Sequence, residues 1–169
     1  PFITIWDDHE VSNDSYVEGA ENHQAEEGDY TARRDAAKQA YYEWMPVREN
    51  NDLLYRSFSF GNLVDLIMLD ERLAGRTAPV DSLEDPSYQD STRSMLGQPQ
   101  RDWLFEQLRG SKAQWKVIGN QVVFSDLRFD DVFPDRPLNL DAWDGYPYEK
   151  RTIIDFLQQN DIQNVIVTT

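Results

Sequence analysis

Short apolar runs recur along the chain, and they predict buried strands. A short apolar run bounded by polar residues is typical of a strand inside a core sheet. The runs span residues 2–6, 63–69, 115–119 and 164–167. Within residues 54–60, apolar and polar side chains alternate, as in a strand with one solvent-exposed face. Gly61-Asn62 then predicts a hairpin turn into the next run.

Apolar residues at helical spacing predict three helices. They span about 29–45, 100–110 and 148–160. Asp29 or Thr31 can cap the first helix, which ends before Pro46, and Gly110 stops the second. The segments without steady periodicity are predicted loops, at 11–28, 75–95 and 125–141. Strands interleaved with amphipathic helices indicate an α/β fold.

Residues with candidate chemistry directly follow the predicted strands. Asp7-Asp8-His9-Glu10, which can bind metal or move protons, comes after the first run. Asp70-Glu71-Arg72 and Asn120-Gln121 follow two later strands. Open α/β sheets place their ligands at the carboxyl ends of strands, so the segment that follows the first run predicts a site. The alternative at residues 7–10 is a solvated acidic loop, but four such groups in a row at a strand end favour a site.

Composition and charge narrow the classes of function. The net charge of −15 argues against a nucleic-acid-binding surface, which needs clustered Lys and Arg. Nine Asp and Glu lie between residues 7 and 29 without any Lys or Arg, which indicates either a solvated loop or a region whose charge bound cations offset. The chain has no Cys, so it can build neither a disulfide nor a thiolate metal site. No stretch is long and apolar enough to span a membrane.

The length of the chain suits one domain. A chain of 169 residues can bury a sizeable core. Predicted strands lie directly at both ends, and the N-terminus has neither an initiator Met nor a signal-peptide pattern. Because domains usually end in polar, frayed segments, we expect both ends to be cut.

Several short motifs, taken in order, carry a family resemblance. They are Trp6-Asp7-Asp8-His9-Glu10, Trp44-Met45-Pro46-Val47, Leu69-Asp70-Glu71-Arg72, Leu96-Gly97 with Gln100 and Trp103-Leu104, Gly119-Asn120-Gln121, and Trp143-Asp144-Gly145-Tyr146. In this order the chain resembles the PhoD-like alkaline phosphatases, a branch of the calcineurin-like metallophosphoesterases. The resemblance implies a four-layer α/β/β/α sandwich, with residues 1–169 forming the central part of one such domain.

The resemblance also implies a site with two metal ions, iron and calcium. Asp8 takes the position of a metal ligand. His9 takes the position of the proton donor to the leaving oxygen. Asn120 or Gln121 is expected to ligate metal, because an amide oxygen suits a hard cation; hydrogen bonding is the alternative role for both. The implied reaction is metal-assisted hydrolysis of a phosphomonoester or phosphodiester.

Further residues of the motifs are expected around these ligands. Arg72 resembles the Arg of a Leu-Asp-Thr-Arg segment and could bind phosphate through its planar fork, with an ion pair to Asp70 as the alternative. The residues expected to support the site or face the substrate are Asp7, Glu10, Trp143, Asp144 and Tyr146. Asp144 would orient the site, and Trp143 and Tyr146 would line one side of it. The alternative is that Asp144 is a turn residue and that the two aromatic residues only pack in the core.

Ligands that the resemblance requires lie outside the matched motifs. The family's iron ligands include a Cys and an Asp-x-x-Tyr pair upstream and a Gly-Asp-x-His segment downstream. We therefore expect the chain alone to be inactive and poorly stable. Family likeness implies a secreted or periplasmic protein.

Two other classes of function stay open from the sequence. One is a non-catalytic acidic module that binds calcium or a protein partner through residues 7–29, although no EF-hand spacing supports it. The other is a degenerate phosphatase kept for binding. The sequence does not indicate an oligomeric state.

Overall fold

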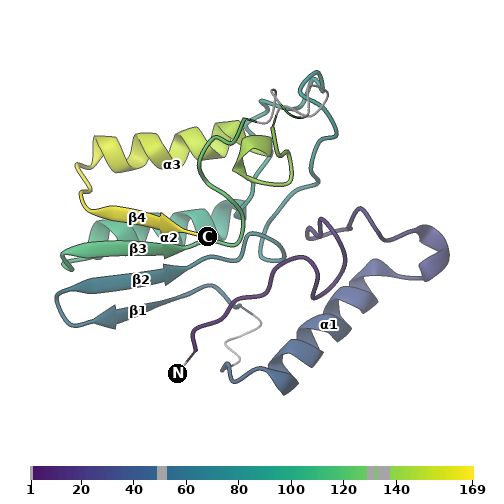
Figure 1. Ribbon diagram of the computed structural model, residues 1–169, viewed down its shortest axis with the longest axis horizontal. Helices are drawn as coiled ribbons and strands as arrows, with labels where there is room; N and C mark the ends of the chain where they lie inside the picture. Colours follow the sequence, from purple (N-terminus) through teal and green to yellow (C-terminus); the bar gives the residue numbers. More distant parts are fainter. Residues whose placement is uncertain (1, 49–52, 129–131, 133–137) are drawn as a thin grey trace.

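A four-stranded mixed sheet organises the structure (Figure 1). The computed structural model describes residues 2–48, 53–128, 132 and 138–169. The strands are β1 Arg56–Phe60, β2 Val64–Met68, β3 Trp115–Gly119 and β4 Val165–Thr168, and they lie side by side in chain order. β1 is antiparallel to β2, whereas β2, β3 and β4 are parallel. The predicted strands at 54–60, 63–69, 115–119 and 164–167 are thereby confirmed, within two residues at each end.

The turn between β1 and β2 is the predicted hairpin. Gly61 has a φ of 60°, a left-handed conformation that glycine adopts without the penalty of a Cβ atom. Consecutive parallel strands instead need long crossover connections, and two helices supply them. α2 Gly97–Gly110 joins β2 to β3, and α3 Pro147–Gln159 joins β3 to β4.

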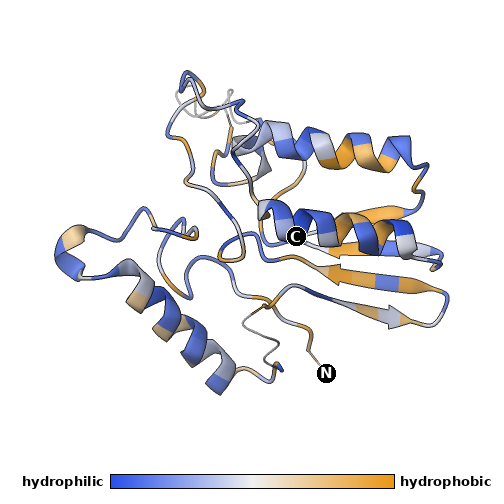
Figure 2. Ribbon diagram, turned by 180° about the vertical axis from the view of Figure 1, so that it is seen from behind, coloured by the Kyte–Doolittle hydropathy of each residue, from blue (hydrophilic) through white to orange (hydrophobic). Residues whose placement is uncertain are grey.

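Both crossover helices pack on the same face of the sheet. Leu104 of α2 and Ile153 of α3 belong to one buried cluster with Ile67 and Ile118 of the strands. The helices also contact each other, since the Phe105 and Phe156 rings stack with centroids 3.9 Å apart. Figure 2 shows the parallel strands as largely hydrophobic bands, while the helices alternate between hydrophilic and hydrophobic residues. This is the layered packing that the sequence pattern predicts.

The opposite face of the sheet has an apolar row running across all four strands. The residues that pair across it are Phe58, Leu66, Val117 and Ile166. Among the described residues, none of these four belongs to a buried hydrophobic cluster. The described residues thus form one sheet with helices on one face, and the second sheet of the expected four-layer sandwich is not among them.

A second, smaller core lies beside the sheet. α1 Tyr30–Trp44 stands apart from the strands (Figure 1) and packs on the N-terminal segment, where the Trp6 and Tyr41 rings meet edge to face at 5.3 Å. Of the two predicted caps, Asp29 is the one that caps the helix, because its side chain accepts the N–H of Ala32 at 3.0 Å.

The predicted strand at residues 2–6 was wrong. A strand needs a partner for its backbone groups, and in the described part of the chain no strand pairs with this segment. Side chains bind its carbonyl groups instead. The Arg56 guanidinium donates to the Thr4 carbonyl, and the Gln121 amide donates to the Trp6 carbonyl at 2.7 Å.

The connections are mostly irregular, as predicted. The loop at 11–28 contains one turn of 3-10 helix, η1 Ala25–Glu27, and a second, η2 Trp143–Gly145, precedes α3. Part of the predicted loop at 125–141 lies outside the described residues. No described helix has the length and apolar character needed to cross a membrane.

Candidate active site

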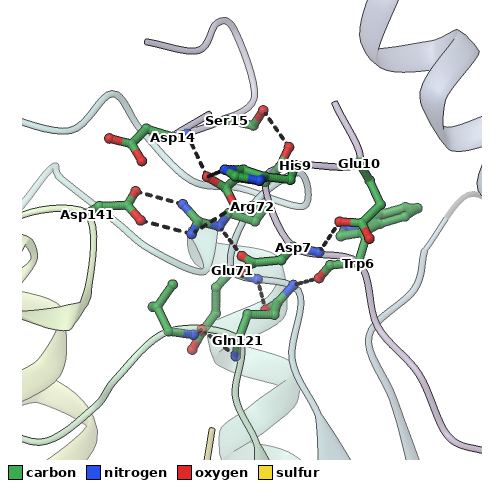
Figure 3. Close-up of polar contacts among 12 residues, drawn as sticks. Trp6, Asp7, His9, Glu10, Asp14, Ser15, Glu71, Arg72, Gln121 and Asp141 are labelled. Carbon is green, nitrogen blue, oxygen red and sulfur yellow. Dashed lines mark hydrogen bonds and ion pairs between the residues drawn. The ribbon is translucent and has the colours of Figure 1, made fainter. Parts of the chain in front are cut away.

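Four segments from different parts of the chain meet at one end of the sheet. They are residues 7–14 after the N-terminal segment, 70–72 after β2, 120–122 after β3, and 141–146 before α3. β2 and β3 are adjacent and parallel, so the segments after them leave the sheet side by side. Figure 3 shows how their polar side chains contact one another. Three of the predicted strand-end segments therefore lie together.

Arg72 is at the centre of this arrangement. Its Nε donates to Asp7 Oδ1 at 2.7 Å, and its two terminal nitrogens donate to the two oxygens of Asp141 at 2.7 and 2.9 Å. Its side chain is only 3% exposed, and Asp8 Oδ1 lies 3.7 Å from one nitrogen. Burial alone would lower the pKa of Arg72, but Asp141, Asp7 and Asp8 raise it, so the guanidinium stays charged.

Asp141 also pairs with a second buried arginine. Arg76 donates to Asp141 Oδ1 at 2.5 Å, and to the Tyr146 hydroxyl at 3.1 Å. Burial opposes ionisation of Asp141, but its hydrogen bond from Arg72 and the charges of both arginines hold its pKa below the usual range. The sequence analysis singled out neither Asp141 nor Arg76.

The two interpretations of Arg72 were phosphate binding and an ion pair with Asp70. The Asp70 carboxylate accepts the backbone N–H groups of Arg72 and Leu73, at 3.1 and 2.9 Å. The Arg72 guanidinium points to Asp7 and Asp141 instead (Figure 3). Asp70 therefore shapes the turn after β2, and the partner that pairs with Arg72 through both oxygens comes from a loop 69 positions away.

Asp8 is nearly buried and organises its own loop. Its carbonyl accepts the N–H groups of Val11 and Ser12 at 2.9 and 2.8 Å, and Asp8 Oδ2 accepts the N–H of Asp14 at 2.8 Å. One oxygen each from Asp8, Asp14 and Asp141 lies within 4.8 Å of the others, close enough to hold a metal ion together. Burial, then the charges of Asp141 and Glu21, raise the pKa of Asp14 to about 6.

His9 extends from the same loop into solvent. Its side chain is 79% exposed, and its Nε2 lies 3.9 Å from Asp8 Oδ2 and 3.1 Å from Asn13 Oδ1. The hydrogen bond to Asn13, and then the charge of Asp8, raise the pKa of His9. Glu10 folds back to accept the N–H of Asp7 at 2.8 Å. His9 is thus an accessible acid beside a buried carboxylate.

The amides of Asn120 and Gln121 have different partners. Gln121 bridges two segments, because its Oε1 accepts the Glu71 N–H and its Nε2 donates to the Trp6 carbonyl, both at 2.7 Å. The amide nitrogen of Asn120 donates to the Val122 carbonyl. Its Oδ1 accepts the indole N–H of Trp143 at 3.2 Å, a long contact. Of the two side-chain amide oxygens, that of Asn120 therefore makes the weaker hydrogen bond.

The Trp143–Tyr146 segment borders the site from the other side. The Trp143 indole reaches Asn120, and the Tyr146 hydroxyl donates to the Thr77 carbonyl at 2.7 Å while it accepts from Arg76. Asp144 is buried and pairs with Lys150 at 3.0 Å. Trp143 and Tyr146 thus contact the site directly, while the Asp144 carboxylate binds α3.

Glu71 is a further residue that the sequence analysis did not assign to the site. Its fully buried carboxylate accepts the N–H groups of Gln121 and Val122 at 2.9 and 3.0 Å, and the Trp143 indole N–H at 2.7 Å. Burial raises the pKa of Glu71 to about 7, and these three donors limit the rise.

Two oxygen atoms that make few hydrogen bonds could serve as ligands of a hard cation. Among the described residues, Asp8 Oδ1 has the 3.7 Å contact with Arg72 as its polar partner, and Asn120 Oδ1 has the long indole contact. A carboxylate and an amide oxygen are the ligand types that calcium and magnesium prefer. Gln121 fits less well, since both ends of its amide make short hydrogen bonds.

These features define an α/β protein with a polar site at the strand ends, and comparison with known proteins gives its family. A solved structure of PhoD matches 99% of this chain and 33% of that chain, with a TM-score of 0.84 and 34% sequence identity. The fold is therefore of the metallophosphoesterase type. The family model for the PhoD-like phosphatases matches residues 1–169, and the chain belongs to that family.

A named relative agrees with this assignment. Alkaline phosphatase D of Bacillus subtilis (strain 168) is 36% identical over 183 aligned residues, which cover 100% of this chain and 30% of the relative. The chain thus spans about a third of the length of the proteins that it matches. The family resemblance stated from the motifs is confirmed.

Proposed function

We propose that this chain contributes to the active site of a metal-dependent phosphoester hydrolase. The substrate class is a phosphomonoester or phosphodiester. The observation that carries the proposal is that the loops after the N-terminal segment, β2 and β3 meet at one end of the sheet in a chain of the PhoD-like family: Arg72 lies beside Asp8, and Glu71 binds the loop that contains Asn120. A general acid, charged side chains and free oxygen donors in one place are what such hydrolysis requires.

Asp8 and Asn120 are the proposed metal ligands in this chain. Calcium suits their oxygen atoms, and a second ion, iron, is proposed on the family resemblance alone. Bound metal ions would orient the phosphate and offset the negative charge that builds up in the reaction. Gln121 supports Asn120 by joining its loop to Trp6 and Glu71.

His9 is the proposed proton donor to the leaving oxygen. Its exposure leaves the imidazole accessible to a substrate, and its raised pKa favours the protonated form nearer to neutral pH. Glu10 supports this loop through the backbone of Asp7. Trp143 and Tyr146 form the opposite wall, and Asp144 anchors that wall to α3.

Arg72 has a double role in this proposal. It fixes Asp7 and Asp141, which accept three of its five N–H groups. The pair of parallel bonds from its two terminal nitrogens is taken by Asp141. A phosphate that binds Arg72 through that same pair of nitrogens must therefore replace Asp141.

The test compares two histidine variants of the full-length protein. His9→Ala is expected to lower the rate of hydrolysis of p-nitrophenyl phosphate and bis(p-nitrophenyl) phosphate by about 100- to 10,000-fold, the usual contribution of a general acid. His23→Ala is the matched control, because His23 is the other histidine of the chain and contacts the Gly28 carbonyl in the same loop. It is expected to leave the rate unchanged.

One observation favours a second candidate, non-catalytic calcium binding. The carboxylates of Asp8, Asp14 and Asp141 are close enough to share an ion without any catalytic group. If the His9→Ala protein hydrolyses both substrates at the wild-type rate, hydrolysis through His9 is refuted. Unchanged calcium binding in that variant, measured by calorimetry, would then support the calcium-binding module.

A further inference from the structure

Glu71 is a fully buried carboxylate that the proposed reaction does not use. It directly follows Asp70 at the end of β2, where the chain turns away from the sheet. A buried carboxylate is costly unless hydrogen-bond donors surround it. Among the described residues, its three donors come from other segments: two backbone N–H groups after β3 and the indole of Trp143. Glu71 therefore joins three loops of the site.

The contacts between Glu71 and the loop after β3 are reciprocal. Oε2 of Glu71 accepts two consecutive backbone N–H groups, those of Gln121 and Val122, at 2.9 and 3.0 Å. In return the Glu71 N–H donates to the side chain of Gln121 at 2.7 Å, as Figure 3 shows. Two consecutive N–H groups on one oxygen fix the direction of the peptide between them. The loop after β3 is thereby locked to the loop after β2.

Asn120 lies directly before this locked peptide. Its amide nitrogen donates to the carbonyl of Val122, whose N–H Glu71 binds. Its Oδ1 faces the Trp143 indole N–H at 3.2 Å, and the same N–H donates to Glu71 Oε1 at the shorter distance of 2.7 Å. The indole N–H of Trp143 thus makes its shorter, stronger hydrogen bond with Glu71. Without it, the indole N–H would turn to Asn120 Oδ1 and occupy a lone pair.

We infer that Glu71 is the positioning residue of the site: it orients Asn120 and keeps the Asn120 Oδ1 atom available to a cation. The inference rests on the proposed function, because it takes Asn120 as a metal ligand. Partners behind a metal ligand fix its orientation, and their loss typically weakens metal affinity by about 10- to 100-fold. Glu71 acts through Asn120 and touches neither metal nor substrate.

Glu149 provides a matched control elsewhere in the fold. It is also fully buried, and its carboxylate accepts the backbone N–H groups of Met95 and Leu96 and the hydroxyl of Ser94. Glu149 also pairs with Arg101 at 3.3 Å, so Glu149→Gln removes a buried carboxylate with at least as many donors, but near the start of α2. A general loss of stability should affect both variants, whereas a loss of positioning should affect only Glu71→Gln.

The experiment titrates calcium chloride into chelator-treated full-length protein and measures affinity by calorimetry. Glu71→Gln is expected to bind calcium about 10- to 100-fold more weakly than the wild type, and Glu149→Gln within about twofold. Hydrogen exchange at the amides of Gln121 and Val122 should accelerate only in Glu71→Gln. If that variant unfolds, Glu71→Asp provides the same test, since its shorter carboxylate keeps the charge but cannot reach all three donors.

The outcomes separate this inference from the proposal on which it rests. Equal calcium affinity and equal exchange in the Glu71 and Glu149 variants would overturn the positioning role and leave the proposed function standing. A wild-type protein that binds no calcium would overturn the metal role of Asn120, and the inference with it.

Discussion

Replacing Asp141 with Asn removes the carboxylate that two buried guanidinium groups share. The side chains of Arg72 and Arg76 are 3% and 0% exposed, and that of Asp141 is 19% exposed. The substitution keeps the size and shape of the side chain, so its effect reports the lost charge and the loss of one acceptor oxygen. Arg72 retains Asp7 as a partner, whereas the partners that Arg76 retains in the described part of the chain are neutral, namely the Tyr146 hydroxyl and the backbone carbonyl of residue 141.

The expected loss of stability follows from this burial. Removing one partner of a buried ion pair typically costs about 3–5 kcal/mol, because the remaining charge is left without compensation. We expect Asp141→Asn to lower the free energy of unfolding by about that amount. With a urea dependence of about 2 kcal/mol/M, the unfolding midpoint should fall by about 1.5–2.5 M.

Asp126→Asn is the control for this measurement. Asp126 pairs with Lys150 at 2.5 Å, but its side chain is 79% exposed. Exposed ion pairs contribute at most about 1 kcal/mol, so the urea midpoint should shift by less than about 0.5 M. If Asp141→Asn costs no more than Asp126→Asn, the two arginines do not depend on the charge of Asp141, and the reasoning is refuted.

Two further predictions concern the same segment. The arginines hold the pKa of Asp141 below the usual value of about 4, so its ionised form stabilises the fold above that pH, and this contribution disappears as the pH falls through the lowered pKa. Urea unfolding at several pH values should therefore show the stability gap between wild type and Asp141→Asn narrowing below about pH 4; a gap that widens there would contradict this. Gly145→Ala should destabilise the protein by about 1–3 kcal/mol in thermal unfolding, because a Cβ at Gly145 would lie 1.9 Å from the Leu140 carbonyl oxygen and push the chain beside Asp141. Gly110→Ala is its control, since a Cβ there meets no atom within 4 Å, and equal melting temperatures would refute the steric argument.

The sequence predicted the strands and helices well because their signals are local. Alternation in β1, the apolar run of β2 and the capping residue Asp29 each depend on a few neighbouring residues. Residues 2–6 have an equally apolar pattern, yet a strand also needs a partner, and the pattern of one segment carries no information about that.

The motifs that follow predicted strands contain residues that the fold brings together. Asp7 and Arg72 lie in contact, and Asn120 and Trp143 share a hydrogen bond. The residues that hold these groups were missed, because their partners are distant in the sequence. Asp141 lies in a loop without periodicity, and only the folded chain shows that it pairs with arginines of another loop.

The separation between contacting residues has a consequence for the order of folding. β1 and β2 meet through a hairpin, and each later strand adds beside the preceding one. The site contacts instead close long stretches of chain: Glu71 and Trp143 are 72 positions apart, and Trp6 and Gln121 are 115 positions apart. Because the entropy lost on closure grows with the length of the closed segment, nearby pairings form at lower cost. The sheet and its helices can therefore assemble first, and the polar residues of the candidate site meet on a scaffold that already exists.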